Sequence, residues 1–152
     1  MNKKFGIYFL KASLIYFGIS VTMGATMTLM SVYDFVMLSI LFARAHAHLS
    51  LIGWVSMSII GFIYITLGYI NKPMYSERLG NIGFCLLNIG LIAEFATLTA
   101  GGYVQASAYV MGHQDAYTDS EPFTAFTVIF AFIMAVGAYT TIYNIYKTLN
   151  TK

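Results

Sequence analysis

Four long apolar stretches most strongly constrain how this chain can fold. They cover residues 6–31, 45–70, 79–103 and 123–147, and each reaches the roughly 20 residues that an α-helix needs to cross a bilayer. Only 9% of the residues are charged and 59% are hydrophobic, whereas about a quarter of the residues in soluble domains are charged. We therefore expect an all-α integral membrane protein that forms one four-helix domain over residues 1–152.

Short polar segments separate the four stretches. Asp34 follows the first, Asn71–Arg78 follows the second, and Gly112–Pro122 precedes the fourth. Gly, Pro, Asn and Asp in these segments are typical of turns, and we expect residues 105–122 to form a loop outside the membrane. Connections this short leave almost no soluble mass, so the function is expected within the bilayer or at its faces.

The basic residues predict the orientation. Four spans place both termini on one side, which collects seven of the eight basic residues, Lys3, Lys4, Lys11, Lys72, Arg78, Lys147 and Lys152. Cytoplasmic loops are enriched in Lys and Arg, so we expect a protein of the cell (inner) membrane with cytoplasmic termini. The net charge is +2 and no basic face is evident, which argues against a nucleic-acid partner.

Two histidines, His46 and His48, lie near the outer end of the second predicted helix. Residues two apart on an α-helix point about 200° from each other, so the pair cannot bind one metal from a single helix. A zinc site would favour a spacing of three or four residues, and a di-iron bundle would need several buried carboxylates where only Glu94 is present. The pair therefore suits two cofactors on opposite sides of the helix, with interfacial histidines bonded to water as the alternative.

The segment HAHLSLIGWVSMSIIGFIY, His46–Tyr64, resembles the histidine-bearing helix of the catalytic subunit of haem–copper oxidases and nitric oxide reductases. The resemblance is closer still to small four-helix proteins grouped with that subunit. The large subunit has twelve helices in three quasi-repeats of four, with metal-binding histidines on the second helix of each repeat. The resemblance implies that this chain is one four-helix repeat of the subunit I fold and that three copies form a homotrimer.

The resemblance also implies a cofactor. In the family a His-x-His serves two different haems, so His46 of one protomer and His48 of its neighbour are the expected axial ligands of one low-spin haem b used in electron transfer. Arg44 is expected near the haem propionates. Gly53 and Trp54 complete the expected cofactor-binding set, the glycine because it leaves room for a macrocycle. The expected redox partner is a protein or a quinone.

Copper is not expected. The family's copper site needs an adjacent His-His pair and a His-x-x-x-Tyr, whereas Ser50 follows His46 by four residues and Ile52 follows His48 by four. Two alternatives stay open. A methionine could be an axial ligand, either Met57 or one of Met23, Met27 and Met30. A haem held by one histidine could instead leave a position open for oxygen or nitric oxide, in a sensor or reductase.

Glu94 is a buried carboxylate in the third predicted helix, about 14 Å below its outer end at a rise of 1.5 Å per residue. Ionisable groups at this depth are costly and usually functional. The residue is a candidate proton relay, a partner for a polar side chain such as Asn88, or the substrate counter-ion of a small multidrug exporter. Other features suggest packing: Gly53 and Gly90 are typical of close helix approach, and Tyr64 and Tyr69 are expected to be lipid or interface anchors.

Overall fold

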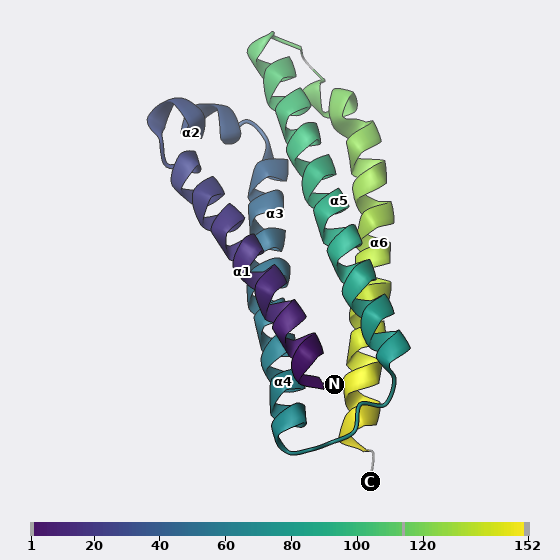
Figure 1. The fold of residues 1–152 in the computed structure, drawn as a ribbon. Helices are drawn as coiled ribbons and strands as arrows, with labels where there is room; N and C mark the ends of the chain where they lie inside the picture. The colour runs from purple at the N-terminus through teal and green to yellow at the C-terminus, as the bar shows by residue number, and fades with distance from the viewer. Residues whose placement is uncertain (1, 114, 151–152) are drawn as a thin grey trace.

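Four helical spans make up the protein (Figure 1). The computed structural model describes residues 2–113 and 115–150. In these ranges it contains only helices: α1 (Asn2–Met27), α2 (Met30–Val36), α3 (Ile40–His48), η1 (Leu49–Ser56), α4 (Met57–Tyr69), α5 (Glu77–Val110) and α6 (Ala116–Leu149). The segments α3, η1 and α4 form one continuous span. The expected all-helical fold with four apolar helices, each long enough to cross a membrane, is confirmed.

The helix ends differ from the predicted spans at the outer side of the first two helices. α1 covers Asn2–Met27 instead of residues 6–31, and the second span begins at Ile40 instead of residue 45. Between them the chain forms the short helix α2, which includes Asp34. Hydropathy alone merged part of α2 with α1, because both are apolar and no proline or glycine separates them.

The predicted loop over residues 105–122 is wrong. α5 continues to Val110 and α6 begins at Ala116, with Pro122 inside α6. A helix needs only its own backbone hydrogen bonds, and neither proline nor glycine occurs between Gln105 and Gly112. Gly112 has a φ of 80°, which is typical of the glycine that ends a helix. Each of these 34-residue helices is about 51 Å long at 1.5 Å per residue. The hairpin therefore extends beyond the roughly 30 Å hydrocarbon core.

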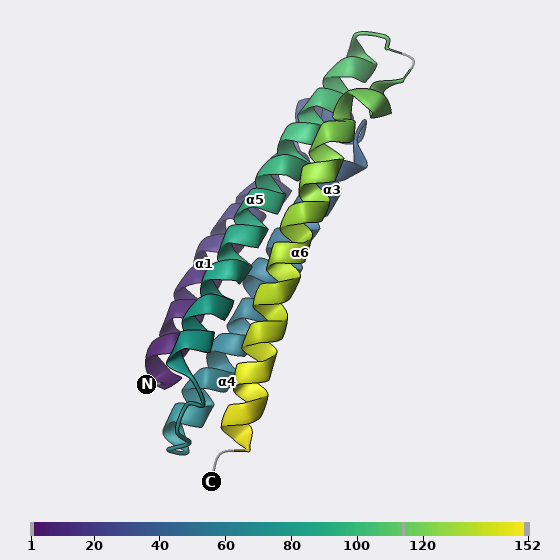
Figure 2. The same cartoon turned by 90° about the vertical axis from the view of Figure 1, so that its right-hand side faces the viewer.

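Two helix pairs form the bundle. α1 packs along η1 and α4, and α5 runs beside α6 over its whole length (Figure 2). Glycines allow the second pair to approach closely: a Cβ added at Gly90 would lie 2.6 Å from the backbone nitrogen of Met134, and one at Gly137 would lie 2.5 Å from that of Leu87. The prediction that Gly90 serves close helix packing is confirmed.

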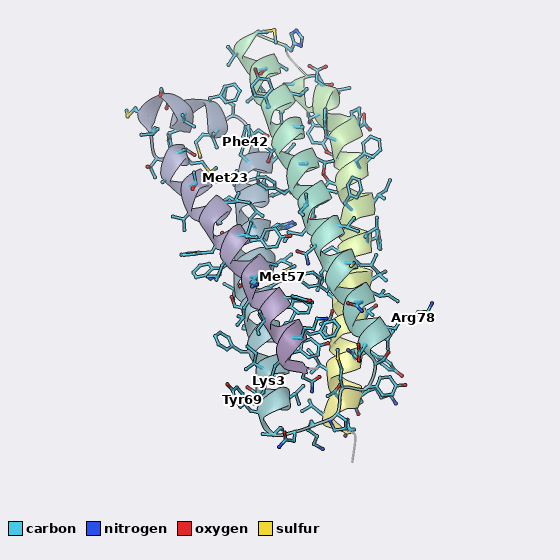
Figure 3. The ribbon with its side chains drawn as sticks, viewed as in Figure 1. Lys3, Met23, Phe42, Met57, Tyr69 and Arg78 are labelled. Carbon is cyan, nitrogen blue, oxygen red and sulfur yellow. The ribbon has the colours of Figure 1, made fainter. Side chains whose placement is uncertain are left out.

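The main core lies between these pairs in the half of the bundle that carries both termini. Phe9, Tyr64 and Met57 are each 0% exposed there. Tyr64 is therefore not a lipid anchor; its hydroxyl accepts a hydrogen bond of 3.1 Å from Nδ2 of Asn144 on α6. Tyr69, in contrast, is 70% exposed and its ring lies 3.9 Å from Nζ of Lys3 (Figure 3).

Candidate functional site

The two histidines lie on the two flanks of α3. Ala45 and Leu49, which lie on the buried side of the helix, are 0% and 1% exposed, whereas His46 and His48 are half-buried. Because α3 begins at Ile40, the histidines lie about 9 and 12 Å along the helix at 1.5 Å per residue. This depth is within the membrane-spanning part of the chain.

His46 faces α1. Its Nδ1 lies 3.5 Å from Oγ of Ser20, which in turn lies 2.5 Å from Oγ of Ser50. Ser50 also donates a hydrogen bond of 2.9 Å to the carbonyl oxygen of His46. The ring rests over Gly24, where an added Cβ would come within 3.1 Å of its Cε1. The position of His46 therefore depends on small and polar residues of α1.

His48 faces α5. Its Nδ1 lies 3.1 Å from Oε2 of Glu94, whose side chain is only 2% exposed, whereas the His48 side chain is 35% exposed. The two atoms are not aligned as a hydrogen bond, and in the described part of the chain neither has a hydrogen-bond partner. Asn88, which the sequence suggested as a partner for Glu94, instead accepts a hydrogen bond of 2.7 Å from the hydroxyl of Tyr16. The two histidines therefore contact different helices, as their two-residue spacing predicts.

A π-helix follows His48 directly and covers Leu49–Ser56. π-Helical turns are rare and frequently occur at functional sites. The wider turn changes the direction of every side chain after His48 relative to a regular α-helix. No feature of the sequence predicted it.

Two residues of the predicted cofactor-binding set, Gly53 and Trp54, pack against neighbouring side chains of the protein. The space beside Gly53 is filled by Tyr16 and Leu91, because an added Cβ would lie 2.8 Å from the Tyr16 side chain and 3.0 Å from that of Leu91. Trp54 packs on Phe17, with ring centroids 4.3 Å apart, and is 39% exposed. Neither residue contacts the histidines in any described interaction. Their positions are explained by the packing of η1 against α1 and α5.

Of the remaining candidates, Arg44 is exposed on the outward side of α3. Met57 is fully buried in the main core. Met23 instead lines a membrane-facing groove of about 680 Å³. Figure 3 shows Met23 on α1 and Phe42 on α3 at the upper part of the bundle.

The groove runs between α1, α2 and α5, and neither histidine lines it. Its wall is almost entirely apolar and consists of Leu14, Ile15, Gly18, Ile19, Thr22, Met23, Thr26, Met27, Val32, Val36, Phe42, Phe95 and Thr99.

Sequence reasoning missed the residues that hold the histidine rings. Ser20 and Gly24 are four residues apart and therefore share one face of α1. That spacing was available from the sequence, but it does not say which helix packs on that face. The contact between Glu94 and His48 could not be predicted for the same reason, because it depends on how α5 docks against α3.

The two histidines offer few metal ligands, so they suit a metal whose other ligands belong to its cofactor. A neutral imidazole presents one nitrogen as a donor and the other as an acceptor or metal ligand, and in both histidines Nδ1 lies near a polar partner. This leaves Nε2 of each ring as the nitrogen for an iron. Haem needs only one or two axial ligands from the protein. The residues present therefore fit a haem.

Comparison with known proteins identifies the family. No curated protein matches the chain. The model of the family described as cytochrome c and quinol oxidase polypeptide I, the haem–copper oxidase subunit I, matches residues 4–140, which include α1 to α5 and most of α6. Since the match covers far more than half of the 152 residues, this chain belongs to the cytochrome c and quinol oxidase polypeptide I family.

Proposed function

We propose that this protein is a membrane b-type cytochrome that transfers electrons, with His46 and His48 as axial ligands of haem iron and without the copper site of the oxidases. The observation that carries the proposal is the position of two half-buried imidazoles on opposite flanks of one membrane helix, each with Nδ1 next to a polar group of a different helix. Membership of a haem-binding family supports the same assignment.

We further propose that the protein is a homotrimer with haem between protomers. Support comes from the divergence of His46 toward α1 and His48 toward α5, because side chains on opposite flanks cannot reach one iron from the same helix. His46 of one protomer and His48 of the next are the two donors that a ring of three copies would bring together. Three four-helix chains would also match the twelve helices of the large subunit.

Two histidine ligands give the haem a defined role. A haem held here supplies a one-electron iron couple, and coordination by two histidines suits electron transfer more than gas binding. Arg44, exposed on the outward side of α3, is the residue we assign to the haem propionates, since Arg binds carboxylates in a bidentate manner. A quinone or a redox protein is the proposed electron partner.

The orientation is part of the proposal. Both termini lie at the same end of the bundle (Figure 1), and seven of the eight basic residues belong to that side of the chain. We assign this end to the cytoplasm and the protein to the inner membrane on the positive-inside rule. The exporter alternative receives no support, because Glu94 is buried against His48 and does not line the groove between α1 and α5.

The proposal is tested by complementation between two inactive chains. His46→Ala and His48→Ala, expressed alone, should each lose most of their bound haem, whereas His113→Ala in the outer connection should keep it. Coexpression of the first two variants with different affinity tags, followed by tandem purification of mixed oligomers, should restore haem, because some interfaces then combine an intact His46 with an intact His48.

Three readouts decide the result: haem content per chain, the oxidised and reduced visible spectra, and the mass of the complex in mild detergent. We expect one haem per chain in the wild type and a mass three times that of the chain. Mixed oligomers without restored haem would contradict sharing between protomers. A colourless wild-type protein that cannot be reconstituted with haem would contradict the cytochrome itself.

A further inference from the structure

Glu94 occupies a position where a carboxyl group needs a specific partner. It lies in the middle of α5, a helix of 34 residues, and its side chain is 2% exposed. Ionisable groups at such a depth almost always pair with another polar group or face a water-filled cavity. The contacts around Glu94 therefore show which polar groups could be its partner.

His48 is the partner that the geometry provides. Its Nδ1 lies 3.1 Å from Oε2 of Glu94, and neither of these buried atoms forms a hydrogen bond with any described residue, so each is the nearest polar group available to the other. The nearby hydroxyl of Thr97 bonds to the backbone carbonyls of Ala93 and Glu94 and does not bond to the carboxyl group. Asn88 is already engaged with Tyr16.

The contact determines which ring nitrogen of His48 can bind a metal. A neutral imidazole carries one proton, and the hydrogen bond made by one nitrogen sets which nitrogen is protonated. A carboxylate can only accept a hydrogen bond, so a proton held between these atoms belongs to Nδ1. The Nε2 lone pair is then free, and it lies on the opposite side of the imidazole ring from the proton on Nδ1.

We infer that Glu94 is the positioning residue of His48: Oε2 of Glu94 accepts the Nδ1 proton, fixes the tautomer and presents Nε2 as the iron ligand. This inference rests on the proposed function, since it assigns the free nitrogen to haem iron. Carboxylates bonded to the second nitrogen of a metal-binding histidine increase the basicity of the ligand. A more basic ligand stabilises ferric iron over ferrous iron and lowers the midpoint potential.

The test compares two substitutions that change charge equally on the same helix. Glu94→Gln retains an oxygen acceptor of the same size but removes the negative charge, while Glu77→Gln makes the same change at the exposed start of α5. We expect Glu94→Gln to keep its haem and to lose part of its preference for ferric iron, because its histidine ligand becomes less basic. A tenfold loss would raise the midpoint potential of a one-electron couple by about 59 mV. Glu77→Gln should leave the potential unchanged.

A second measurement needs no haem. Nitrogen-15 NMR of wild-type protein with labelled histidine, prepared without haem and assigned with His46→Ala and His113→Ala, reports which nitrogen of His48 is protonated. We expect the proton on Nδ1. In Glu94→Leu, which removes the acceptor, this preference should disappear.

The outcomes separate this inference from the proposed function. A wild-type protein that binds no haem overturns the proposed function and the role of Nε2 as its ligand. A wild-type protein that binds haem, combined with equal midpoint potentials for Glu94→Gln and Glu77→Gln, overturns the inference alone. A proton on Nε2 of His48 in the haem-free protein also overturns it, because Glu94 would then donate to Nδ1 and would not accept from it.

Discussion

Replacing Gly90 with alanine should separate the two long helices. A Cβ at this position would lie 2.6 Å from the backbone nitrogen and 2.7 Å from the Cα of Met134. Favourable contacts between such atoms occur at about 3.5–4.0 Å, so α5 and α6 would have to move apart by about 1 Å. A flexible side chain could rotate away, but these are backbone atoms of α6 and cannot.

The expected cost follows from two opposing contributions. Overpacking a well-packed interface costs about 1–3 kcal/mol, and alanine gains about 0.5–1 kcal/mol over glycine inside a helix. We therefore expect Gly90→Ala to lower the free energy of unfolding by about 1 kcal/mol, near the middle of a range of about 0–2.5 kcal/mol. The change also reaches the candidate site, because Glu94 lies one helical turn further along α5.

The assay is thermal unfolding in mild detergent, followed by circular dichroism, with Gly18→Ala as the matched control. An added Cβ at Gly18 meets nothing within 4 Å, so the same substitution there should stabilise the protein by about 0.5–1 kcal/mol. Gly90→Ala should lower the Tm by a few degrees and Gly18→Ala should raise it. Equal or higher stability of Gly90→Ala would refute the close approach of α5 and α6.

Three further substitutions test the core and the surroundings of the histidines. Asn144→Leu leaves the buried hydroxyl of Tyr64 without its donor and should cost about 1–3 kcal/mol in thermal unfolding; an unchanged Tm would contradict this. Arg44→Gln should lower the haem midpoint potential in a redox titration, because it removes a positive charge that stabilises the reduced haem; an unchanged or higher potential would place Arg44 away from the propionates. Gly24→Val should displace the His46 ring, which lies 3.1 Å from an added Cβ, and reduce the haem content per chain; full haem content would contradict the packing of His46 on α1.

The four spans were predictable because hydropathy over 20 or more residues is a strong signal that tertiary contacts rarely override. The helix ends were less predictable for a physical reason. Outside the membrane, a helix continues until a breaker occurs, so α5 reaches Val110 and α6 begins at Ala116, although residues 105–122 are more polar. Hydropathy reports where the membrane ends and not where the helix ends.

In the candidate site, too, local geometry was predictable from the sequence and contacts between helices were not. Helical periodicity correctly separated the directions of His46 and His48, since that depends only on local geometry. The partners of the two rings, Ser20 on α1 and Glu94 on α5, depend on how the helices dock. The filling of the space beside Gly53 by Tyr16 and the π-helix after His48 are also consequences of packing that single-helix reasoning does not reach.

The visible spectrum of the purified protein, recorded oxidised, reduced with dithionite, and reduced under carbon monoxide, tests the central claim most directly. In the proposed cytochrome two histidines would occupy both axial positions, so we expect sharp α and β bands on reduction that carbon monoxide does not change. A spectrum that shifts with carbon monoxide would contradict coordination by both histidines and indicate an open position for a gas. A spectrum without haem bands would contradict the assignment of the protein as a cytochrome.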